Sequence, residues 1–464
     1  MHESSGYTPE NISAHFVGVG GAGMSALANI LLARGARVSG SDLKDSKYLR
    51  TLSEKGAEVS VGHRKENVKD PDVVVVSTAI PETNPEVVEA RARGIEVWPR
   101  AQMLAYLAGD RKTIAVAGTH GKTSTSSMVA TMLRSMGEHP SFCIGGVVDG
   151  VNANAENGSG DLYVVEADES DGSFVFLEPK IAVVTNMEPD HLDHYADFDE
   201  IKDVFVDFMQ RAHEDGAIII CGDDEDLVQT ARRVSNRVIV TYGKGAHCDY
   251  MYRVTGRKGM GSTFELIHEG AVVATSSIAV PGEHMVANAA ASLVCAAMLG
   301  LDLAQAGEGL STFSGVRRRF DLIDEVNDIT IVDDYGHHPT EIAATLKAAA
   351  SLDYERVVVA FQPHRYSRVQ NLVREFGDAF EDADRVIILD VYSAGEAPIP
   401  GVSGRSIVAS ILEQHPRAQV AFIPHRQEIT SYLTLMCRPG DIVLTMGAGD
   451  VTTIGPEMAK ELRR

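Results

Sequence analysis

Ten apolar runs of Val, Ile, Leu and Ala recur along this chain, and most stand between segments long enough for a helix. The runs are continuous rather than alternating, which is typical of strands buried on both faces of a sheet. Such a succession indicates an α/β protein with mainly parallel sheets. The predicted strands are Ala14–Val19, Val73–Ser77, Thr113–Ala117, Leu162–Glu166, Ile181–Thr185, Ala217–Cys221, Ile329–Val332, Val357–Phe361, Val386–Leu389 and Ile442–Thr445.

The length of 464 residues is too great for one core, and glycine-marked units predict three domains, at residues 1–110, 111–315 and 316–464. The polar, Gly-rich segment Thr241–Ala279 predicts a small antiparallel insertion in the central domain. The apolar stretch Met285–Leu301 fits a buried helix better than a membrane span.

The amino-acid composition limits which partners and which cellular compartment are expected for this chain. The net charge of −23 argues against nucleic acid or an anionic membrane as a partner. Five scattered cysteines without a C-x-x-C pair, and an N-terminus without an apolar signal segment, predict a cytoplasmic protein with reduced thiols. The oligomeric state is left open between monomer and homodimer.

The segment Ala117–Thr123 is a glycine loop between a predicted strand and a predicted helix at Ser124–Met136. A loop of this kind binds phosphate through backbone N–H groups and the helix N-terminus, while Lys122 adds a charge and Thr123 a hydroxyl for Mg²⁺. The spacing departs from the Walker pattern, because the first glycine is Gly118. The alternative is a chance Gly-Lys-Thr turn.

A second glycine loop, with G-x-G-x-x-G at Gly18, Gly20 and Gly23, follows the first strand and precedes a predicted helix from Ser25. Asp42 lies 19 residues beyond Gly23, which is the spacing of a ribose-binding acid in a Rossmann unit. The pattern predicts a site for a nucleotide diphosphate without deciding which one. NAD is the generic interpretation, and a purely structural glycine turn is the alternative.

Acidic residues follow two strands of the central domain. Glu166 ends one strand and is placed to ligate a cation that bridges ATP phosphates, whereas a solvated loop is expected for the acids from Asp168 to Asp171. The next strand leads to His191, flanked by Asp190 and Asp193. Metal ligation and a structural role are equally compatible with this histidine.

Taken together, these residues resemble the Mur ligases, the ATP-dependent amide-forming enzymes of peptidoglycan assembly. The resemblance spans nearly the whole chain and is nearest to the branch that adds L-alanine to UDP-N-acetylmuramate. The segments that carry it are Gly18–Ala26, Ala117–Thr123, Glu166–Asp171, Asn186–Tyr195, Pro281–Ala291, Gly315–Asp321, Asp333–Glu341 and Gln362–Arg368.

The resemblance implies a Rossmann-like UDP-sugar domain, a central ATPase and a C-terminal domain that brings the amino acid. It reassigns the first loop from NAD to UDP-sugar, and implies sugar-nucleotide contacts at Gly18, Gly20, Gly21, Gly23, Met24, Asp42, Ser77 and Ala79. It implies ATP contacts at Gly118, Thr119, His120, Gly121, Lys122, Thr123, Asn288, Arg319 and Asp333. The implied catalytic residues are Lys122, Glu166 and His191, with Mg²⁺ held by Thr123, Glu166 and His191.

The implied reaction joins the lactyl carboxylate of UDP-N-acetylmuramate to L-alanine through an acyl phosphate, giving ADP and phosphate. Arg365 and Arg368, three residues apart after a predicted strand, can clamp the amino-acid carboxylate, although surface arginines on a solvated loop are the alternative. The proton of the amine would pass to His338, His364 or water. An exposed structural role is expected for His337.

The chain departs from the family at two places. Some relatives carry a carbamylated lysine where this chain has Phe205 or Val206, and the alanine-adding branch lacks it too. Met285 replaces an asparagine expected near adenine. Three alternatives stay open: a recycling ligase that joins a whole peptide to the same sugar nucleotide, an NAD-dependent oxidoreductase, and a non-catalytic nucleotide switch.

Overall fold

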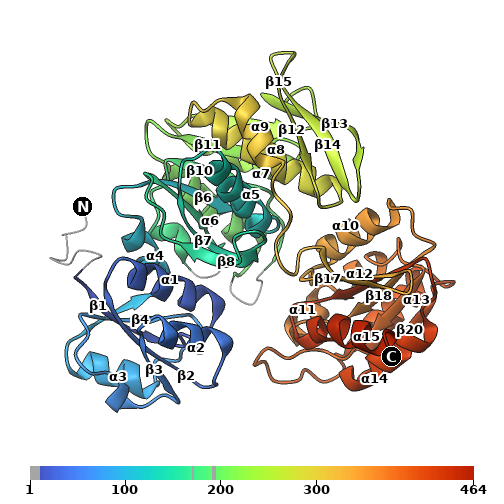
Figure 1. Cartoon of the computed structure of the whole chain (residues 1–464), viewed down its shortest axis with the longest axis horizontal. Helices are drawn as coiled ribbons and strands as arrows, with labels where there is room; N and C mark the ends of the chain where they lie inside the picture. Colours follow the sequence, from blue (N-terminus) through green and yellow to red (C-terminus); the bar gives the residue numbers. More distant parts are fainter. Residues whose placement is uncertain (1–10, 170–171, 191–194) are drawn as a thin grey trace. The chain divides into compact units, whose positions relative to one another are not determined.

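The computed structural model describes residues 11–169, 172–190 and 195–464 of the chain. It is an α/β structure with three sheets of mainly parallel strands, which confirms the predicted fold class (Figure 1). The chain divides into two compact units. One contains residues 1–254, 264–276 and 287–313, and the other contains residues 255–263, 277–286 and 314–464. The division into three domains at residues 110 and 315 stays a prediction.

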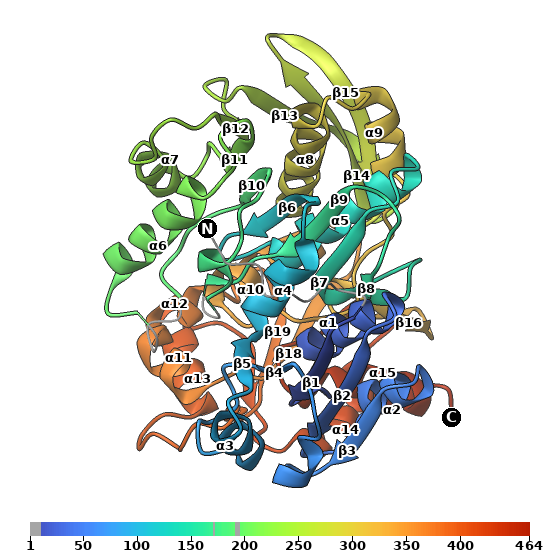
Figure 2. The same cartoon turned by 90° about the vertical axis from the view of Figure 1, so that its left-hand side faces the viewer.

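The first sheet has five parallel strands in the order β3-β2-β1-β4-β5. Helices α1, α2 and α4 pack on one face, and α3 packs on the other face against Val17 and Val74 (Figure 2). From β1 the chain adds β2 and β3 on one side of the sheet and then β4 and β5 on the other side. The carboxyl ends of β1 and β4 therefore flank a topological switch point. The elements are β1 (Ser13–Val17), α1 (Ala22–Ala33), β2 (Arg37–Asp42), α2 (Lys47–Glu54), β3 (Glu58–Val61), η1 (Lys65–Asn67), β4 (Val73–Val76), α3 (Pro85–Ala92), β5 (Glu96–Pro99) and α4 (Arg100–Ala108).

The second sheet has ten strands in the order β15-β14-β13-β12-β11-β10-β6-β9-β7-β8. Two-residue turns join β13 to β14 and β14 to β15, a connection that only antiparallel strands can make. The elements are β6 (Lys112–Ala117), α5 (Lys122–Ser135), β7 (Ser141–Val148), β8 (Ala153–Glu156), β9 (Leu162–Glu166), η3 (Ser173–Val175), β10 (Ile181–Val184), α6 (Phe198–Gln210), β11 (Ala217–Cys221), α7 (Glu225–Ala231), β12 (Ile239–Gly243), β13 (Tyr250–Lys258), β14 (Gly261–His268), β15 (Ala271–Ile278), α8 (Glu283–Met298) and α9 (Leu303–Leu310).

The third sheet has the order β16-β17-β21-β18-β19-β20, and only the edge pair β16–β17 is antiparallel. The carboxyl ends of β17, β21 and β18 are neighbours, so the loops after them share one edge. The elements are β16 (Asp321–Val326), β17 (Ile329–Asp334), α10 (Pro339–Ala350), β18 (Arg356–Phe361), α11 (Tyr366–Asn371), α12 (Val373–Asp378), β19 (Arg385–Ile388), α13 (Gly404–Gln414), β20 (Val420–Phe422), α14 (Arg426–Met436), β21 (Asp441–Met446), η4 (Asp450–Thr453) and α15 (Ile454–Leu462).

The ten predicted strands are confirmed to within two residues at each end. Two helix starts were predicted too late, because α1 begins at Ala22 and α5 at Lys122 rather than at Ser25 and Ser124. The antiparallel insertion also begins later than predicted. Thr241 belongs to β12, which pairs in parallel with β11, and the antiparallel strands begin at β13.

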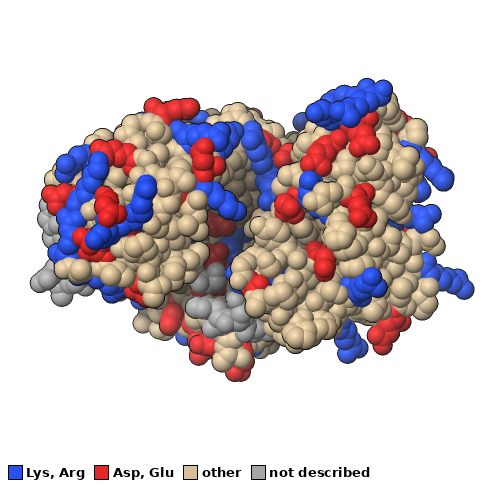
Figure 3. Space-filling model, turned by 90° about the horizontal axis from the view of Figure 1, so that it is seen from below, with Lys and Arg blue, Asp and Glu red and all other residues tan. Residues whose placement is uncertain are grey.

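The charged side chains of both signs are interspersed over the face shown in Figure 3. The helices in the described part of the chain are all too short or too polar to cross a lipid bilayer. The predicted buried helix is observed as α8, and Leu293 and Val294 in it are fully buried.

Candidate active site

The phosphate loop connects β6 to α5, and its shape depends on glycine. Gly118 and Gly121 have φ values of +127° and +83°, which residues with a Cβ rarely adopt. A Cβ on Gly121 would lie 2.8 Å from Oδ1 of Asn288, so this glycine also lets α8 approach the loop. Gly121 is the N-cap of α5 and supplies no side-chain cap. The first N–H groups of α5 are therefore suited to an anion.

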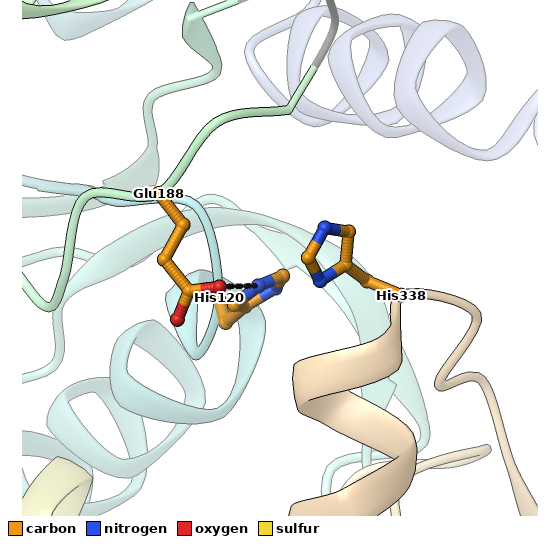
Figure 4. A group of neighbouring side chains, drawn as sticks. All are labelled: His120, Glu188 and His338. Carbon is orange, nitrogen blue, oxygen red and sulfur yellow. Dashed lines mark ion pairs between the residues drawn. The ribbon is translucent and has the colours of Figure 1, made fainter. Parts of the chain in front are cut away.

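Residues that follow β10 form hydrogen bonds with the same loop. Asn186 accepts the His120 N–H through Oδ1 at 2.8 Å and donates to the His120 carbonyl oxygen at 2.9 Å. The hydroxyl of Thr119 accepts the backbone N–H of Glu188 at 2.8 Å. Nε2 of the His120 ring lies 3.6 Å from a carboxylate oxygen of Glu188 (Figure 4). Asn186 and Glu188 were not predicted as contacts, and only their position in a polar cluster after a strand signalled them.

Lys122 lies at the start of α5 among carboxylates. Its ammonium contacts Glu169 at 3.1 Å, and the two side chains are only 11% and 4% exposed. Burial by itself would lower the pKa of Lys122, but Glu169, Asp168 and Glu166 together raise it above its ordinary value. The expectation of a solvated loop is therefore wrong for Glu169, because this carboxylate is buried as the partner of Lys122. The lysine is therefore charged at neutral pH.

Thr123 and Glu166 meet where β9 ends beside α5. The Thr123 hydroxyl is 3.0 and 3.1 Å from the two carboxylate oxygens of Glu166, and Gly145 N–H donates to one of them at 2.8 Å. Hydroxyl and carboxylate oxygens are ligands that Mg²⁺ prefers, so these two residues fit the predicted ion. His191, the third predicted ligand, lies outside the described residues.

The first glycine loop is held by the end of β2. The carbonyl oxygen of Ser41 accepts the N–H groups of Gly18 and Val19, at 2.8 and 2.9 Å. Oδ2 of Asp42 accepts the Gly20 N–H at 2.9 Å. The N-cap of α1, Gly21, has no side-chain cap, so the first-turn N–H groups, which include Gly23 and Met24, are the donors suited to a diphosphate.

Ser77 and Ala79 follow β4 on the other side of the switch point. Ser77 is half-buried and Ala79 is exposed, and the Ser77 carbonyl oxygen accepts the Ile80 N–H at 3.0 Å. The Ile80 side chain packs close to Gly18, because a Cβ on this glycine would lie 3.2 Å from the isoleucine Cδ1. The predicted UDP-sugar residues therefore occupy the ends of β1, β2 and β4, and their contacts with the sugar nucleotide stay a prediction.

In the C-terminal unit, Arg365 is the N-cap of α11 and has φ +67° and ψ 135°. This backbone conformation is strained for a residue with a Cβ, and such strain is often found at functional sites. The Arg365 N–H donates to the Tyr392 carbonyl oxygen at 2.9 Å. Arg368, one turn later in α11, is 9% exposed. Because Arg368 is buried, a solvated-loop interpretation does not apply to it.

Three histidines follow β17 and β18. The His337 and His364 rings are 5.6 Å apart, and His364 stacks on Tyr392. His337 is mostly buried, which corrects the exposed position expected for it, and burial lowers its pKa to about 3. Burial, followed by Arg368 and Arg365, lowers the pKa of His364 to about 4. His338 is the N-cap of α10 and accepts the Thr340 N–H at 3.4 Å through Nδ1.

Arg319 and Asp333 lie in different surroundings. The guanidinium of Arg319 is 3.5 Å from Glu341 and lies over the Tyr335 ring. Asp333 is fully buried and accepts hydrogen bonds from Thr445 at 2.7 Å and Thr452 at 2.6 Å. Oδ2 of Asp333 also pairs with Nε of Arg318 at 3.3 Å, whereas Oδ1 keeps a further acceptor site. Both ATP contacts stay predictions.

Comparisons with known proteins agree with this arrangement. The Mur ligase family catalytic domain matches residues 13–112, the Mur ligase middle domain matches residues 116–296, and the Mur ligase glutamate ligase domain matches residues 318–449. A UDP-N-acetylmuramate–L-alanine ligase of Geotalea uraniireducens (strain Rf4) is 45% identical over 97% of this chain and 98% of its own. The chain belongs to the Mur ligase family.

Two solved structures of Mur ligase relatives superpose over nearly the whole chain. A UDP-N-acetylmuramate-alanine ligase from Thermotoga maritima is 28% identical, with a TM-score of 0.82 over 97% of this chain and 99% of its own. A murein peptide ligase from Psychrobacter arcticus 273-4 is 25% identical, with a TM-score of 0.72 over 97% and 98% of the two chains. Of the two residues compared with the carbamylated lysine, Phe205 and Val206, the first is fully buried, and its ring centroid lies 5.3 Å from that of Phe174.

Proposed function

We propose that this chain joins L-alanine to the lactyl carboxylate of UDP-N-acetylmuramate and converts ATP to ADP and phosphate. The observation that carries the proposal is the meeting of Lys122, Thr123 and Glu166 at one strand edge, in a chain 45% identical to a UDP-N-acetylmuramate–L-alanine ligase. ATP and Mg²⁺ are part of the proposal, as are small-molecule substrates and a cytoplasmic site of action. The monomer or homodimer prediction is untested.

The first step activates the carboxylate. A lactyl carboxylate oxygen attacks the γ-phosphorus of ATP, the bond to the β,γ-bridging oxygen breaks, and ADP leaves from the resulting acyl phosphate. Both reactants are anions, so positioning and neutralisation of charge supply most of the catalysis. Lys122 is charged and has to exchange part of its contact with Glu169 for phosphate oxygens. Thr123 and Glu166 would hold Mg²⁺, which supplies further positive charge when bound.

The second step forms the amide. The neutral amine of L-alanine attacks the acyl carbon, and phosphate departs from the tetrahedral intermediate. Arg365, and less directly Arg368, are proposed to bind the alanine carboxylate. Burial, Arg368 and Arg365 lower the pKa of His364 to about 4, which weakens it as a base for the amine proton. His338, His364 and water stay the candidate acceptors of that proton.

Phosphate release tests the proposal directly. The purified chain, with ATP, Mg²⁺ and UDP-N-acetylmuramate, is expected to release phosphate with L-alanine at a rate far above that with other amino acids. The same assay with the tripeptide of murein in place of L-alanine tests the recycling alternative. This alternative has the weaker support, because the murein peptide ligase is 25% identical to this chain and the L-alanine ligase is 45% identical. Preference for the peptide, or ATP turnover that ignores both acceptors, would refute the proposal.

A further inference from the structure

Outside the phosphate sites, two neighbouring connections bring together three different metal-binding side chains. Asp223 follows β11, and His247 and Cys248 lie on the connection between β12 and β13. One carboxylate oxygen, one imidazole nitrogen and the thiol sulfur all lie within 4.8 Å of one another. Neither the predicted ATP site nor the predicted sugar-nucleotide site includes these residues.

Local hydrogen bonds orient two of the three donors. Oδ2 of Asp223 accepts the Lys244 N–H at 2.8 Å, and Oδ1 accepts the Gly245 N–H at 3.2 Å, which leaves lone pairs on the carboxylate. Nε2 of His247 lies 2.9 Å from the Gly222 carbonyl oxygen and so carries the ring proton. The lone pair of the neutral ring is then on Nδ1. A histidine that binds a metal commonly donates its other N–H to a carbonyl group in this way.

Three glycines provide the space for the three donors. A Cβ on Gly222 would lie 2.6 Å from Sγ of Cys248, and a Cβ on Gly243 would lie 2.7 Å from Oδ2 of Asp223. A Cβ on Gly245 would overlap the His247 ring at Cε1 and Nδ1. Side chains at these positions would block the approach of the donors to one another. The two connections therefore keep a thiol, an imidazole and a carboxylate together.

We propose that Asp223, His247 and Cys248 form a binding site for a thiophilic divalent cation of the Zn²⁺ class. Zinc takes thiolate, imidazole and carboxylate ligands together, and its tetrahedral ligand atoms lie about 3 to 4 Å apart, which small side-chain rotations would reach here. Three protein ligands leave the fourth position to water. Mg²⁺ is a poor match, because it prefers an all-oxygen shell of the kind that Thr123 and Glu166 offer.

Hydrogen bonds link the residue next to this site with the phosphate loop. Asp224, adjacent to Asp223, caps α7 and also accepts the Met187 N–H at 2.9 Å. Met187 is followed by Glu188, whose N–H donates to the Thr119 hydroxyl. A cation bound at Asp223 would therefore restrain the strand end that braces the phosphate loop. Zn²⁺ is expected to raise the unfolding temperature of the protein.

Cobalt substitution tests the site without relying on enzymatic activity. Co²⁺ added to the full chain, freed of metals and in reducing buffer, is expected to give the near-ultraviolet thiolate charge-transfer absorption with a stoichiometry of one ion per chain. Zn²⁺ should displace the band, and an excess of Mg²⁺ should not. The Cys248→Ser variant should lose the band, and His247→Ala should weaken Co²⁺ binding at least tenfold.

Two variants serve as matched controls. Cys437→Ser removes a half-buried thiol elsewhere, and His213→Ala removes a histidine that pairs with Asp215 on an exposed turn. Both are expected to keep the band, and circular dichroism establishes that all four variants are folded. Absence of the band in the wild-type chain at millimolar Co²⁺, or its persistence in a folded Cys248→Ser variant, would overturn the proposal.

Discussion

Lys122 and Glu169 show how one residue pair prepares the phosphate loop. The Lys122 ammonium also donates to the Gly118 carbonyl oxygen at 2.6 Å, so the side chain folds back over its own loop. A buried ion pair is costly to break by removing one partner, because the other charge is left without compensation. In the proposed reaction, the polyphosphate of ATP would take the place of Glu169 and keep the lysine charged.

We expect Lys122→Ala to lower the rate of ligation about a hundred- to a thousandfold, roughly 3 to 4 kcal/mol, because the transferring phosphoryl group loses a charge contact. Binding of UDP-N-acetylmuramate should be nearly unchanged, since its predicted residues surround another loop. Steady-state kinetics and calorimetric titration measure the two effects. Lys347→Ala, at an exposed position on α10, is the control. More than about a tenth of the activity left in Lys122→Ala would contradict the loop assignment.

At Arg365, backbone strain and side-chain chemistry can be separated. Arg365→Ala should raise the KM for L-alanine strongly and leave those for ATP and the sugar nucleotide almost unchanged, and Arg365→Lys should restore binding only in part. Arg365→Gly should bind alanine as poorly as Arg365→Ala does. Its free energy of unfolding should exceed that of Arg365→Ala by about 1 kcal/mol, because glycine adopts φ +67° without strain. Kinetics and urea unfolding of the three variants decide this. A defect confined to ATP would place Arg365 on the nucleotide instead.

Strand ends and helix starts position most of the candidate residues. In the first sheet, the end of β2 holds the glycine loop through Ser41, and the Ser41 hydroxyl donates to Glu86 near the start of α3 at 2.5 Å. Glu86 is fully buried and also accepts the Arg64 N–H at 3.1 Å and an Asn67 N–H at 2.5 Å. This carboxylate therefore connects β2, α3 and η1 beneath the predicted diphosphate site.

The stability of this connection should depend on pH. Burial alone would raise the pKa of Glu86, but the His15 ring 3.7 Å away and hydrogen bonds from Ser41, Asn67 and the Arg64 N–H lower it from 4.5 to about 2. Because the folded pKa lies below the unfolded one, the ionised group stabilises the protein above pH 4.5, and this stabilisation is lost as the pH falls toward 2. The shift corresponds to roughly 3 kcal/mol.

Urea unfolding between pH 7 and pH 3 should therefore show Glu86→Gln to be less stable than the wild type at neutral pH, with the difference shrinking in acid. Glu54→Gln, an exposed position at the end of α2, is the control and should follow the wild type. An equal loss at both pH values would mean that the ionisation of Glu86 contributes nothing.

The end of β9 gives a second prediction for an element. Glu166→Gln should raise the Mg²⁺ concentration needed for half-maximal activity, because a carboxylate ligand beside Thr123 is replaced by a neutral amide. Activity measured against Mg²⁺ concentration tests this, with Glu178→Gln at an exposed position as the control. His191→Ala should behave like Glu166→Gln. Unchanged metal dependence in both variants would return this cluster to a structural role.

For the whole molecule, the candidate residues belong to two compact units, with the two glycine loops in one and Arg365 in the other. The net charge of −23 opposes the binding of the proposed anionic substrates. We therefore expect binding to depend on local helix N-termini, Lys122 and arginines rather than on the overall field.

Hydrogen exchange with single ligands should separate these sites. UDP-N-acetylmuramate is expected to protect amides near residues 18–24 and 77–80, and a non-hydrolysable ATP analogue with Mg²⁺ those near residues 118–123. Mass spectrometry of proteolytic fragments measures both. A sugar nucleotide that protected only residues 118–123 would reverse the assignment of the two glycine loops.

Local pattern was enough to predict much of this protein. Continuous apolar runs are required where a strand is covered on both faces, so the strands, the fold class and the positions of both glycine loops followed from sequence spacing. The partners of those loops did not. Glu169 looked like a solvated acid because its neighbours in sequence are polar, and only the packing of β9 beside α5 buries it against Lys122.

Likewise, tertiary packing brings together residues that lie 25 or more positions apart in the chain. Examples are Ser41 with Glu86, Asn186 with His120, and Asp223 with Cys248. A hydrogen bond or a ligand set depends on distances of a few ångströms, and these are decided by which strands become neighbours. The sequence by itself therefore determined the elements and the kind of chemistry at their ends. The tertiary structure decided which of those ends meet.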